Sequence, residues 1–367
     1  MAKIVYSMAG EGRGHATRVR AMVEELRADH RLILYAPGDA HDLLEPAYRD
    51  TEVEVRPHSC LRFHYVENRL DPSRTVWESA NYLRRVPGLL RRLRRDLERD
   101  KPDLVISDFE PALPRAARRV GIPFLSLDHQ HFLLVNDLSG LPTALRARAW
   151  LWGQAVRLYF SGQVETVVSS FFTAPIRAPW RGRTTPVATL LRPEVLRAER
   201  RRDGHLALYL RKFSSPALFA ALKACGRTVH IYGLGEKADD GPLRFHAIDQ
   251  ARFLEHLATG DALISTAGNQ VVGEALYLGK PVLAMPETDN HEQYINAHFL
   301  RQLGVGDWVE LAGIKPSDLT GFLGRLDEFR GRIDPTVFNG NPAALAVVRR
   351  HLTAPVRPVP VPLLAAP

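Results

Sequence analysis

Short apolar runs alternate with longer amphipathic stretches along most of the chain. Runs such as LVIS and HLALYL carry no formal charge, and such runs are typical of strands buried on both faces of a parallel sheet. The stretches between them repeat apolar residues every three or four positions, which indicates helices. Alternating buried strands and helices predict an α/β protein built from doubly wound parallel sheets. We expect strands at residues 3–7, 31–36, 104–107, 122–127, 167–170, 205–210, 229–234, 262–264 and 282–285.

The length and one change in composition predict two domains. A chain of 367 residues is long enough for two cores. Residues 175–186 (PIRAPWRGRTTP) have the proline, glycine and arginine content of a linker. We therefore predict a first domain over 1–175, a linker over 176–186 and a second domain over 187–340. A last helix is expected over 341–352, and the proline-rich residues 353–367 are expected to form an extended or disordered tail.

The most informative stretch runs from Asp261 to Phe299. A buried strand leads into Ser-Thr-Ala-Gly, and a helix then starts near Asn269 and ends at Gly279. A glycine turn between a strand and a helix points backbone N–H groups and the positive end of the helix dipole at one place. This arrangement favours phosphate at Gly268 and Asn269. The alternative is a βαβ unit whose glycine only lets helix and strand pack closely.

Polar side chains near this turn suit a sugar. Glu274 lies about one and a half turns into the helix, where its carboxylate can accept a hydrogen bond from a ribose hydroxyl. Glu292 and Gln293 open the next helix at the same edge of the sheet, and their side chains match hydroxyl groups that both donate and accept. The stretch is therefore interpreted as a nucleotide-sugar site.

The first strand is followed by a glycine loop that ends in a histidine, Gly10-Glu-Gly12-Arg13-Gly14-His15. The spacing is GxGxG rather than GxGxxG, and no acidic residue ends the second strand, so a nicotinamide dinucleotide site has little support. An imidazole at this edge titrates close to neutral pH and can take a proton from a hydroxyl group. The alternative for His15 is a local hydrogen bond at the start of the helix.

Two further strand ends carry titratable side chains. Asp108 follows the strand LVIS, and its alternative role is that of a helix N-cap. His129 and His131 follow the strand at 122–127. Two histidines can bind a metal, but the sequence offers no third ligand, so we predict no metal site. We expect both histidines to line the acceptor side of a cleft.

Three segments together resemble GT-B glycosyltransferases. They are STAGNQVVGEALYLGKPVLAMPETDNHEQYINA, the glycine loop GEGRGHATR and ISDFEPALPRAARRVGIP. The chain looks most like the UDP-glucuronosyltransferase-like group (family 1) and the N-acetylglucosaminyltransferase that completes the lipid-linked peptidoglycan precursor (family 28). The resemblance implies two Rossmann-like doubly wound domains facing each other across a cleft, the first binding the acceptor and the second the donor. It also implies that the helix at 341–352 crosses back to the first domain.

The resemblance assigns roles to individual residues. It implies that His15 is the catalytic base and that Asp108 orients its imidazole, as the carboxylate of a hydrolase triad does. It implies that Gly12, Arg13 and Gly14 form the glycine loop that carries His15. It also implies donor contacts from the second domain, including a cation for the diphosphate and main-chain groups that read the base. The donor residues are Arg211, Ile248, Thr266, Gly268, Asn269, Gln270, Glu274, Glu292 and Gln293.

The expected activity is an inverting, metal-independent transfer of a sugar from a nucleotide diphosphate sugar, UDP-sugar first, to a hydroxyl acceptor. No cofactor is expected beyond this co-substrate. The two glutamates that retaining enzymes place as EX7E are absent, since Val282 stands eight positions after Glu274, and no convincing DxD metal motif occurs. Two departures from the family 1 pattern leave the base open: no tryptophan lies in FHAIDQ, and Thr266 stands where many members have histidine. The alternatives are a UDP-N-acetylhexosamine 2-epimerase-like enzyme and a non-catalytic nucleotide-sugar-binding protein.

Composition changes this picture little. Hydrophobic residues make up 45% and charged residues 25% of the chain, as in ordinary globular proteins. The formal charge is +8, but no nucleic-acid-binding module is recognisable, so we expect no nucleic acid partner. The basic amphipathic helix expected over 82–99 can lie on an anionic membrane or pack on the sheet with a solvated arginine face. Two cysteines and the lack of a recognisable signal peptide fit a cytoplasmic protein. Peripheral contact with the inner membrane surface is compatible with this localisation. An apolar or lipid-linked acceptor is compatible with it as well.

Overall fold

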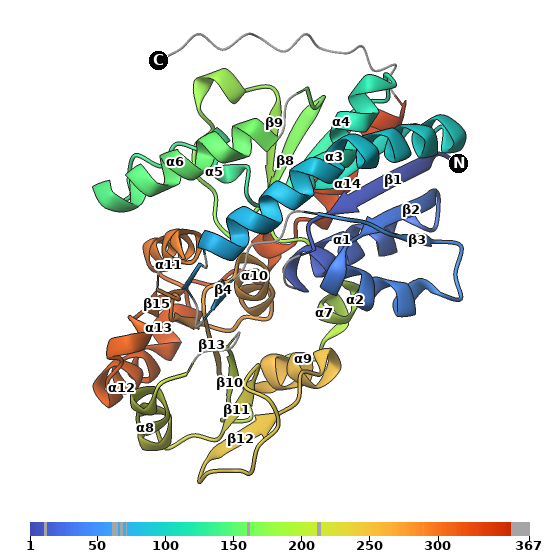
Figure 1. The fold of residues 1–367 in the computed structure, drawn as a ribbon. Coiled ribbons are helices and arrows are strands. Elements are labelled where there is room, and N and C mark those ends of the chain that lie inside the picture. Colours follow the sequence, from blue (N-terminus) through green and yellow to red (C-terminus); the bar gives the residue numbers. More distant parts are fainter. Residues whose placement is uncertain are drawn as a thin grey trace.

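The computed structural model describes residues 1–10, 13–60, 65–66, 69–70, 72–159, 162–210, 214–288 and 290–353. These residues form two parallel sheets with helices on both faces, one above the other in Figure 1. The predicted architecture of two Rossmann-like domains is therefore confirmed.

The first sheet has seven strands in the order β3-β2-β1-β6-β7-β8-β9, and all its neighbours run parallel. The strands that follow β1 are added on one side of the sheet, and those that follow β6 are added on the other side. The loops after these two strands therefore diverge, which opens a crevice at their carboxyl ends. The strands are β1 (Lys3–Met8), β2 (Arg31–Ala36), β3 (Glu54–Pro57), β6 (Leu104–Asp108), β7 (Phe124–Asp128), β8 (Glu165–Ser169) and β9 (Thr184–Val187).

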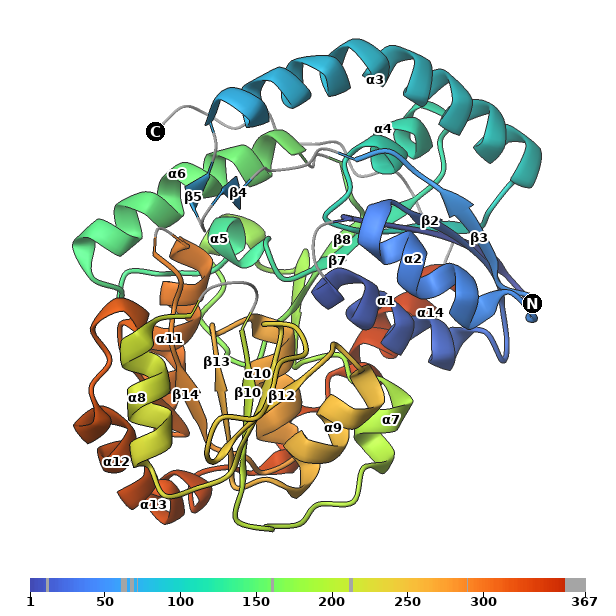
Figure 2. The same cartoon turned by 60° about the horizontal axis from the view of Figure 1, so that its bottom comes forward.

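Helices cover both faces of the first sheet. They are α1 (Arg13–Leu26), α2 (Gly38–Tyr48), α3 (Pro72–Asp100), α4 (Ala112–Arg119), α5 (Phe132–Val135) and α6 (Thr143–Tyr159). A short antiparallel pair, β4 (Tyr65–Val66) and β5 (Arg69–Leu70), precedes α3. Figure 2 shows α3 lying across the outside of this domain.

The basic helix expected over 82–99 is the second half of α3. Its Leu90, Leu93 and Leu97 side chains are buried in one cluster with residues of β6 and α4, while its arginines are exposed. This is the arrangement expected of an amphipathic helix that packs on a sheet. None of the helices that the structure describes has the length and hydropathy needed to span a membrane.

The second sheet has six parallel strands in the order β12-β11-β10-β13-β14-β15. The order reverses between β10 and β13, so a second crevice is expected at their carboxyl ends. The strands are β10 (Leu206–Tyr209), β11 (Val229–Tyr232), β12 (Leu243–His246), β13 (Ala262–Ser265), β14 (Val282–Ala284) and β15 (Gly306–Trp308). The helices are α7 (Pro193–Arg197), α8 (Pro216–Ala224), α9 (Gln250–Thr259), α10 (Asn269–Tyr277), α11 (His291–Leu303), α12 (Pro316–Gly324) and α13 (Leu326–Arg330), with 3₁₀ turns η2 (Leu311–Gly313) and η3 (Pro335–Phe338).

The predicted linker over 176–186 needs a correction. It contains the 3₁₀ turn η1 (Ala178–Trp180) and the first three residues of β9, which pairs in parallel with β8. Pro186 has no N–H, but β9 is the edge strand of the sheet, where the missing donor is tolerated. The first domain therefore extends to Val187, beyond the predicted boundary at 175.

The last helix, α14 (Asn341–Thr353), packs against the first sheet rather than the second. Ala344, Val347 and Val348 are buried in one cluster with residues of β1, β2 and β6. Arg350 Nη2 donates to both carboxylate oxygens of Glu165 on β8, at 2.8 and 2.6 Å. The predicted tail over 353–367 lies outside the described residues, apart from Thr353.

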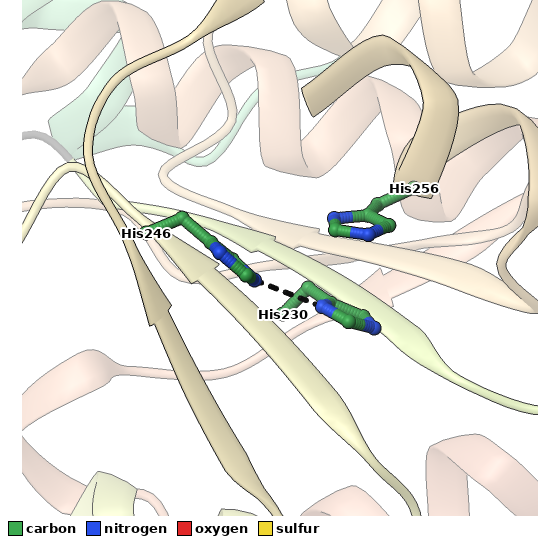
Figure 3. Close-up of side chains that lie close together, drawn as sticks. All are labelled: His230, His246 and His256. Carbon is green, nitrogen blue, oxygen red and sulfur yellow. Dashed lines mark hydrogen bonds between the residues drawn. The ribbon is translucent and has the colours of Figure 1, made fainter. Parts of the chain in front are cut away.

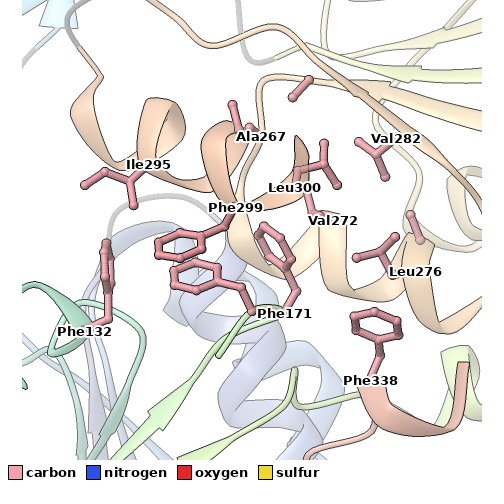
Figure 4. Packing of buried hydrophobic residues seen from close by; sticks show 14 of the residues in the cluster. Phe132, Phe171, Ala267, Val272, Leu276, Val282, Ile295, Phe299, Leu300 and Phe338 are labelled. Carbon is pink, nitrogen blue, oxygen red and sulfur yellow. The ribbon is translucent and has the colours of Figure 1, made fainter. Parts of the chain in front are cut away.

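The two domains share one apolar cluster that joins their cores. It contains Phe132 and Phe171 from the first domain and Val272, Leu276 and Phe299 from the second (Figure 4). The rings of Phe172 and Phe299 stack with centroids 3.9 Å apart and planes inclined by 6°. This stack is a direct contact between rings from different domains.

Candidate active site

The carboxyl ends of β1 and β6 bring His15 and Asp108 together. Asp108 is the last residue of β6 and pairs with Met8 at the end of β1, whereas His15 lies in the first turn of α1. The His15 Nδ1 atom is 2.9 Å from Asp108 Oδ1. A carboxylate oxygen accepts hydrogen bonds, so this contact favours the His15 tautomer that carries its proton on Nδ1 and its lone pair on Nε2. The His15 side chain is 13% exposed and that of Asp108 is fully buried, so the imidazole lies at the surface of the site with the carboxylate behind it.

Arg18 is a third member of this group that the sequence analysis did not single out. Its Nε donates to Asp108 Oδ2 at 2.8 Å and its Nη2 to Oδ1 at 2.7 Å, while Nη2 lies 3.1 Å from His15 Nδ1. Burial alone would lower the pKa of Arg18, but the Asp108 carboxylate outweighs it and the pKa is raised. The signal for this residue was the i, i+3 spacing of His15 and Arg18, which places both on one helix face.

Backbone strain marks the two loops that carry predicted site residues. Phe109, directly after Asp108, has φ of 55°, and Ala267, directly before Gly268, has φ of 62°. A left-handed conformation is uncommon for residues other than glycine and tends to occur where function fixes the backbone. Asn296 of α11 holds the second loop by donating to the Ala267 carbonyl at 2.9 Å.

The start of α10 faces the start of α1. A Cβ atom placed on Gly14 would lie 3.9 Å from the Cβ of Gln270, so the two helix ends approach each other closely. Gly268 is the N-cap of α10 and contributes no side chain to its amide groups. The first four N–H groups of a helix have no partner within the helix, so this end can bind an anion. Thr266 is buried beside it.

The side chains of Asn269 and Gln270 are engaged in contacts of their own. Asn269 donates to the Ser169 carbonyl at 3.2 Å and accepts from the Phe171 N–H at 3.2 Å, so it joins α10 to the end of β8. Gln270 Nε2 donates to the Leu190 carbonyl at 2.8 Å. These two side chains hold α10 against the first domain and against the segment between β9 and α7. The backbone amide groups at the start of α10 are the groups that can bind an anion.

Glu274 lies deeper in α10 and is paired with Arg192. The Arg192 Nε and Nη2 atoms each donate to a Glu274 carboxylate oxygen at 3.3 Å, and Gln270 Nε2 donates to Oε1 at 3.1 Å. Burial would lower the pKa of Arg192, but the Glu274 charge raises it overall. Arg192 is therefore a further residue of this region that sequence reasoning missed.

His129 and Glu292 approach each other from opposite domains. His129 is buried at the end of β7, its Nδ1 donates to the Ser169 carbonyl at 3.1 Å, and burial lowers its pKa. The His129 Nε2 atom is 4.0 Å from the carboxylate of Glu292, the second residue of α11. Gln293 holds the loop before α11 by donating to Glu287 Oε2 at 3.1 Å.

His131 forms part of a buried network within the first domain. Its Nδ1 is 2.7 Å from Asp128 Oδ2, and Ser126 Oγ donates to the same oxygen at 2.7 Å. Burial would raise the pKa of Asp128, but these contacts outweigh it and lower the pKa to about 2. His131 is therefore bonded within the first domain, whereas His129 faces Glu292 of the second.

The remaining predicted residues are placed as follows. Ile248 is 46% exposed in the loop between β12 and α9. Arg13 belongs to α1, whereas Gly12 and Arg211 lie outside the described residues.

Two parallel-sheet domains that face each other, with their switch points opposed, define the GT-B fold. The model of the family described as Glycosyl transferase family 1 matches residues 2–327. The chain belongs to this family, which confirms the resemblance found in the sequence.

Solved structures of glycosyltransferases share the fold. The calicheamicin glycosyltransferase CalG4 is 21% identical, with a TM-score of 0.67 over 97% of this chain and 100% of that chain. A UDP-glucosyltransferase from Polygonum tinctorium that glucosylates indoxyl is 14% identical, with a TM-score of 0.70 over 97% and 99% of the two chains. The Streptomyces glycosyltransferase SsfS6, solved with thymidine diphosphate, is 16% identical, with a TM-score of 0.58 over 95% and 100%. No curated protein matches the chain.

Proposed function

We propose that this glycosyltransferase moves a sugar, with inversion and without a metal ion, from a nucleotide diphosphate sugar to a hydroxyl acceptor. The observation that carries the proposal is the approach of two helix ends. His15, backed by Asp108 at 2.9 Å, lies in the first turn of α1, and the start of α10 lies opposite it. A proton acceptor thus faces an anion-binding helix end across the gap between the domains.

In the proposed reaction the acceptor hydroxyl gives its proton to His15 Nε2 as its oxygen attacks the anomeric carbon. The bond from that carbon to the diphosphate oxygen breaks on the opposite face, and its electron pair leaves with the nucleoside diphosphate. Asp108 stabilises the imidazolium that forms, as in a hydrolase triad. The amide groups and dipole at the start of α10, with Arg211, stabilise the charge of the departing diphosphate.

The donor is proposed to lie along the second domain, with its base at the loop that carries Ile248 and its sugar near Glu292. UDP-sugars are the first candidates, because the resemblance is to UDP-sugar enzymes. The solved structures that share the fold include a UDP-glucosyltransferase and a glycosyltransferase in complex with thymidine diphosphate. A donor panel should therefore include UDP- and dTDP-sugars, with GDP-sugars for comparison.

The acceptor is proposed to enter beside His129, on the side of the first domain. We place the protein in the cytoplasm, where the exposed arginines of α3 can contact an anionic membrane and an apolar or lipid-linked acceptor. Cosedimentation with vesicles that do or do not contain anionic lipid tests the membrane contact. Equal recovery with both kinds of vesicle would argue against it.

The experiment that tests the function is replacement of His15 by alanine. We expect transfer from the best donor to fall about 100- to 10,000-fold, the usual contribution of a general base. Donor affinity, measured by calorimetry, should stay within about twofold, because the diphosphate binds at α10. His30→Ala, at the amino end of β2 on the opposite edge of the same sheet, is the matched control and should keep full activity. Unchanged turnover in His15→Ala would refute the assignment.

A further inference from the structure

Four histidines gather on one face of the second sheet, away from the residues of the proposed reaction. His230 lies on β11, His246 ends β12, His256 lies on α9 and His205 directly precedes β10. They meet because β10, β11 and β12 are neighbours in the sheet, with Ala207 opposite His230 and Tyr232 opposite His246, and because α9 covers this part of the sheet (Figure 3).

Three of these side chains bring ring nitrogens together. The His230 Nδ1 atom is 2.9 Å from His246 Nε2, and one nitrogen from each of His230, His246 and His256 lies within 4.8 Å of the others. Ligand atoms around a tetrahedral zinc ion, each about 2.05 Å from the metal, lie about 3.3 Å apart. The separation of 2.9 Å between His230 Nδ1 and His246 Nε2 is close to this value, so small movements are enough for His230 and His246 to share one ion.

The third ring, that of His256, has contacts of its own. Tyr232 Oη is 2.6 Å from His256 Nδ1, which leaves Nε2 of His256 as its ligand atom. His205 Nε2 donates to the His256 carbonyl at 2.9 Å, and the His205 ring meets the His230 ring edge-on at 4.9 Å. The His256 ring stacks on that of His230 with centroids 3.6 Å apart, so ion binding requires a rotation of the His256 ring, since lone pairs lie in the ring planes.

The surroundings of His230, His246 and His256 favour the neutral form of each ring. Burial first, and then the neighbouring imidazoles, lowers the pKa of His230 to about 3 and that of His256 to about 4, and burial lowers the pKa of His246. Hydrogen bonds link these rings to one another and to Tyr232, and no carboxylate among the described residues forms an ion pair with them. Neutral imidazole is the protonation state that binds metals, and nitrogen ligands select borderline transition metals over Mg²⁺ and Ca²⁺.

We propose that His230, His246 and His256 form a binding site for a divalent transition-metal ion of the zinc type, with Tyr232 and His205 as outer partners. The ion ties together β11, β12 and the covering helix α9. His246 is also the last residue before the loop that carries Ile248 and the α9 N-cap Asp249. The ion would therefore hold the start of that loop, and its role is structural rather than catalytic. This site is independent of the transfer chemistry proposed for His15.

The test is a titration of the full chain, prepared without a histidine tag, with ZnSO₄ by calorimetry, together with thermal unfolding in the presence of Zn²⁺ or Mg²⁺. We expect one Zn²⁺ per chain and a rise in Tm of several degrees at saturating Zn²⁺, because a ligand that binds only the folded protein stabilises it. Mg²⁺ should give no shift. His246→Gln and His256→Gln should each weaken Zn²⁺ binding at least about tenfold.

His30→Gln, which changes a histidine outside the cluster, is the control and should bind Zn²⁺ as tightly as the unaltered chain. Far-UV circular dichroism without metal shows whether each variant is folded. If a cluster variant does not fold, Co²⁺ absorption of the unaltered chain decides, since a tetrahedral nitrogen site gives a visible band that Zn²⁺ removes. The proposal is overturned if the unaltered chain shows no saturable binding, or if both cluster variants bind Zn²⁺ as tightly as His30→Gln.

Discussion

The guanidinium of Arg18 donates hydrogen bonds to both oxygens of the Asp108 carboxylate, at 2.8 and 2.7 Å, and both side chains are buried. The carboxylate behind His15 is therefore neutralised by a permanent positive charge from the same helix. A buried carboxylate without such a partner would be strongly disfavoured. Arg18 thus holds the Asp108 carboxylate in place beside the His15 ring.

The first prediction concerns this pair. Arg18→Ala should lower the free energy of unfolding by about 3–5 kcal/mol, because it leaves the Asp108 charge buried without compensation. Asp108→Asn removes that charge, so the double variant should be destabilised by clearly less than the sum of the two single effects. Urea unfolding of the four proteins measures this coupling. Strictly additive effects would show that the two side chains stabilise the fold independently.

The second prediction concerns the close packing of α10 on the segment that joins β9 to α7 and connects the two domains. A Cβ on Gly273 would lie 1.8 Å from Thr189 Oγ1, and Thr189 is fully buried. Gly273→Ala should therefore push α10 away from this segment and destabilise the protein by about 1–3 kcal/mol. Donor affinity should fall as well, because the start of α10 moves.

Gly321→Ala is the matched control for this substitution. Gly321 is exposed in the middle of α12, its φ is not positive, and nothing lies within 4 Å of the Cβ that alanine would add. Alanine is the better helix former by up to about 1 kcal/mol, so this variant should be as stable as the unaltered chain or slightly more so. Thermal unfolding measures both variants. Equal Tm values for the two alanine variants would contradict the packing argument.

The sequence predicted those parts of the fold that depend on local pattern. Each expected strand has a counterpart, and α10 begins at Asn269 as expected, with Gly279 at φ of 74° after its end. The meeting of His15 and Asp108 could be expected as well, because parallel strands place their following loops at one edge of the sheet. Arg18 was visible in the same motif, three residues after His15, but its partner could be named only from the fold.

Contacts between residues far apart along the chain could not be predicted from the sequence. The hydrogen bonds that engage Glu274 come from Arg192, 82 positions away. Asn269 was expected at the donor, but its side chain bonds to Ser169, 100 positions away in the other domain. The histidine cluster likewise depends on the order of strands in the sheet, since positions 230, 246 and 256 have no common spacing. Such partners follow from topology, which local periodicity does not encode.

The third prediction concerns the attachment of α14 to the first sheet and its dependence on pH. Glu165 on β8 accepts from Arg350 at 2.8 and 2.6 Å and is 2.7 Å from His351 Nε2. Burial would raise the pKa of Glu165, but these partners and Thr185 outweigh it and lower the pKa from its ordinary value of 4.5 to about 2. Because the folded state holds the carboxylate more acidic than the unfolded chain does, the stabilisation is complete above pH 4.5. It is lost as the pH falls from there towards 2.

Glu165→Gln should therefore lower the free energy of unfolding at pH 7 by about 1–2 kcal/mol, less than the full shift implies, because Arg350 is 57% exposed and solvent screens the pair. The difference from the unaltered chain should shrink as the pH is lowered below 4.5, where Glu165 of the unfolded chain takes up a proton. Denaturant unfolding at a series of pH values measures it. Glu328→Gln, which removes an exposed carboxylate of α13 that pairs with Arg325 and Arg332, should change stability too little to measure at any pH. A Glu165→Gln effect that is the same at pH 7 and in acid would mean that the ionised carboxylate does not hold α14 in place.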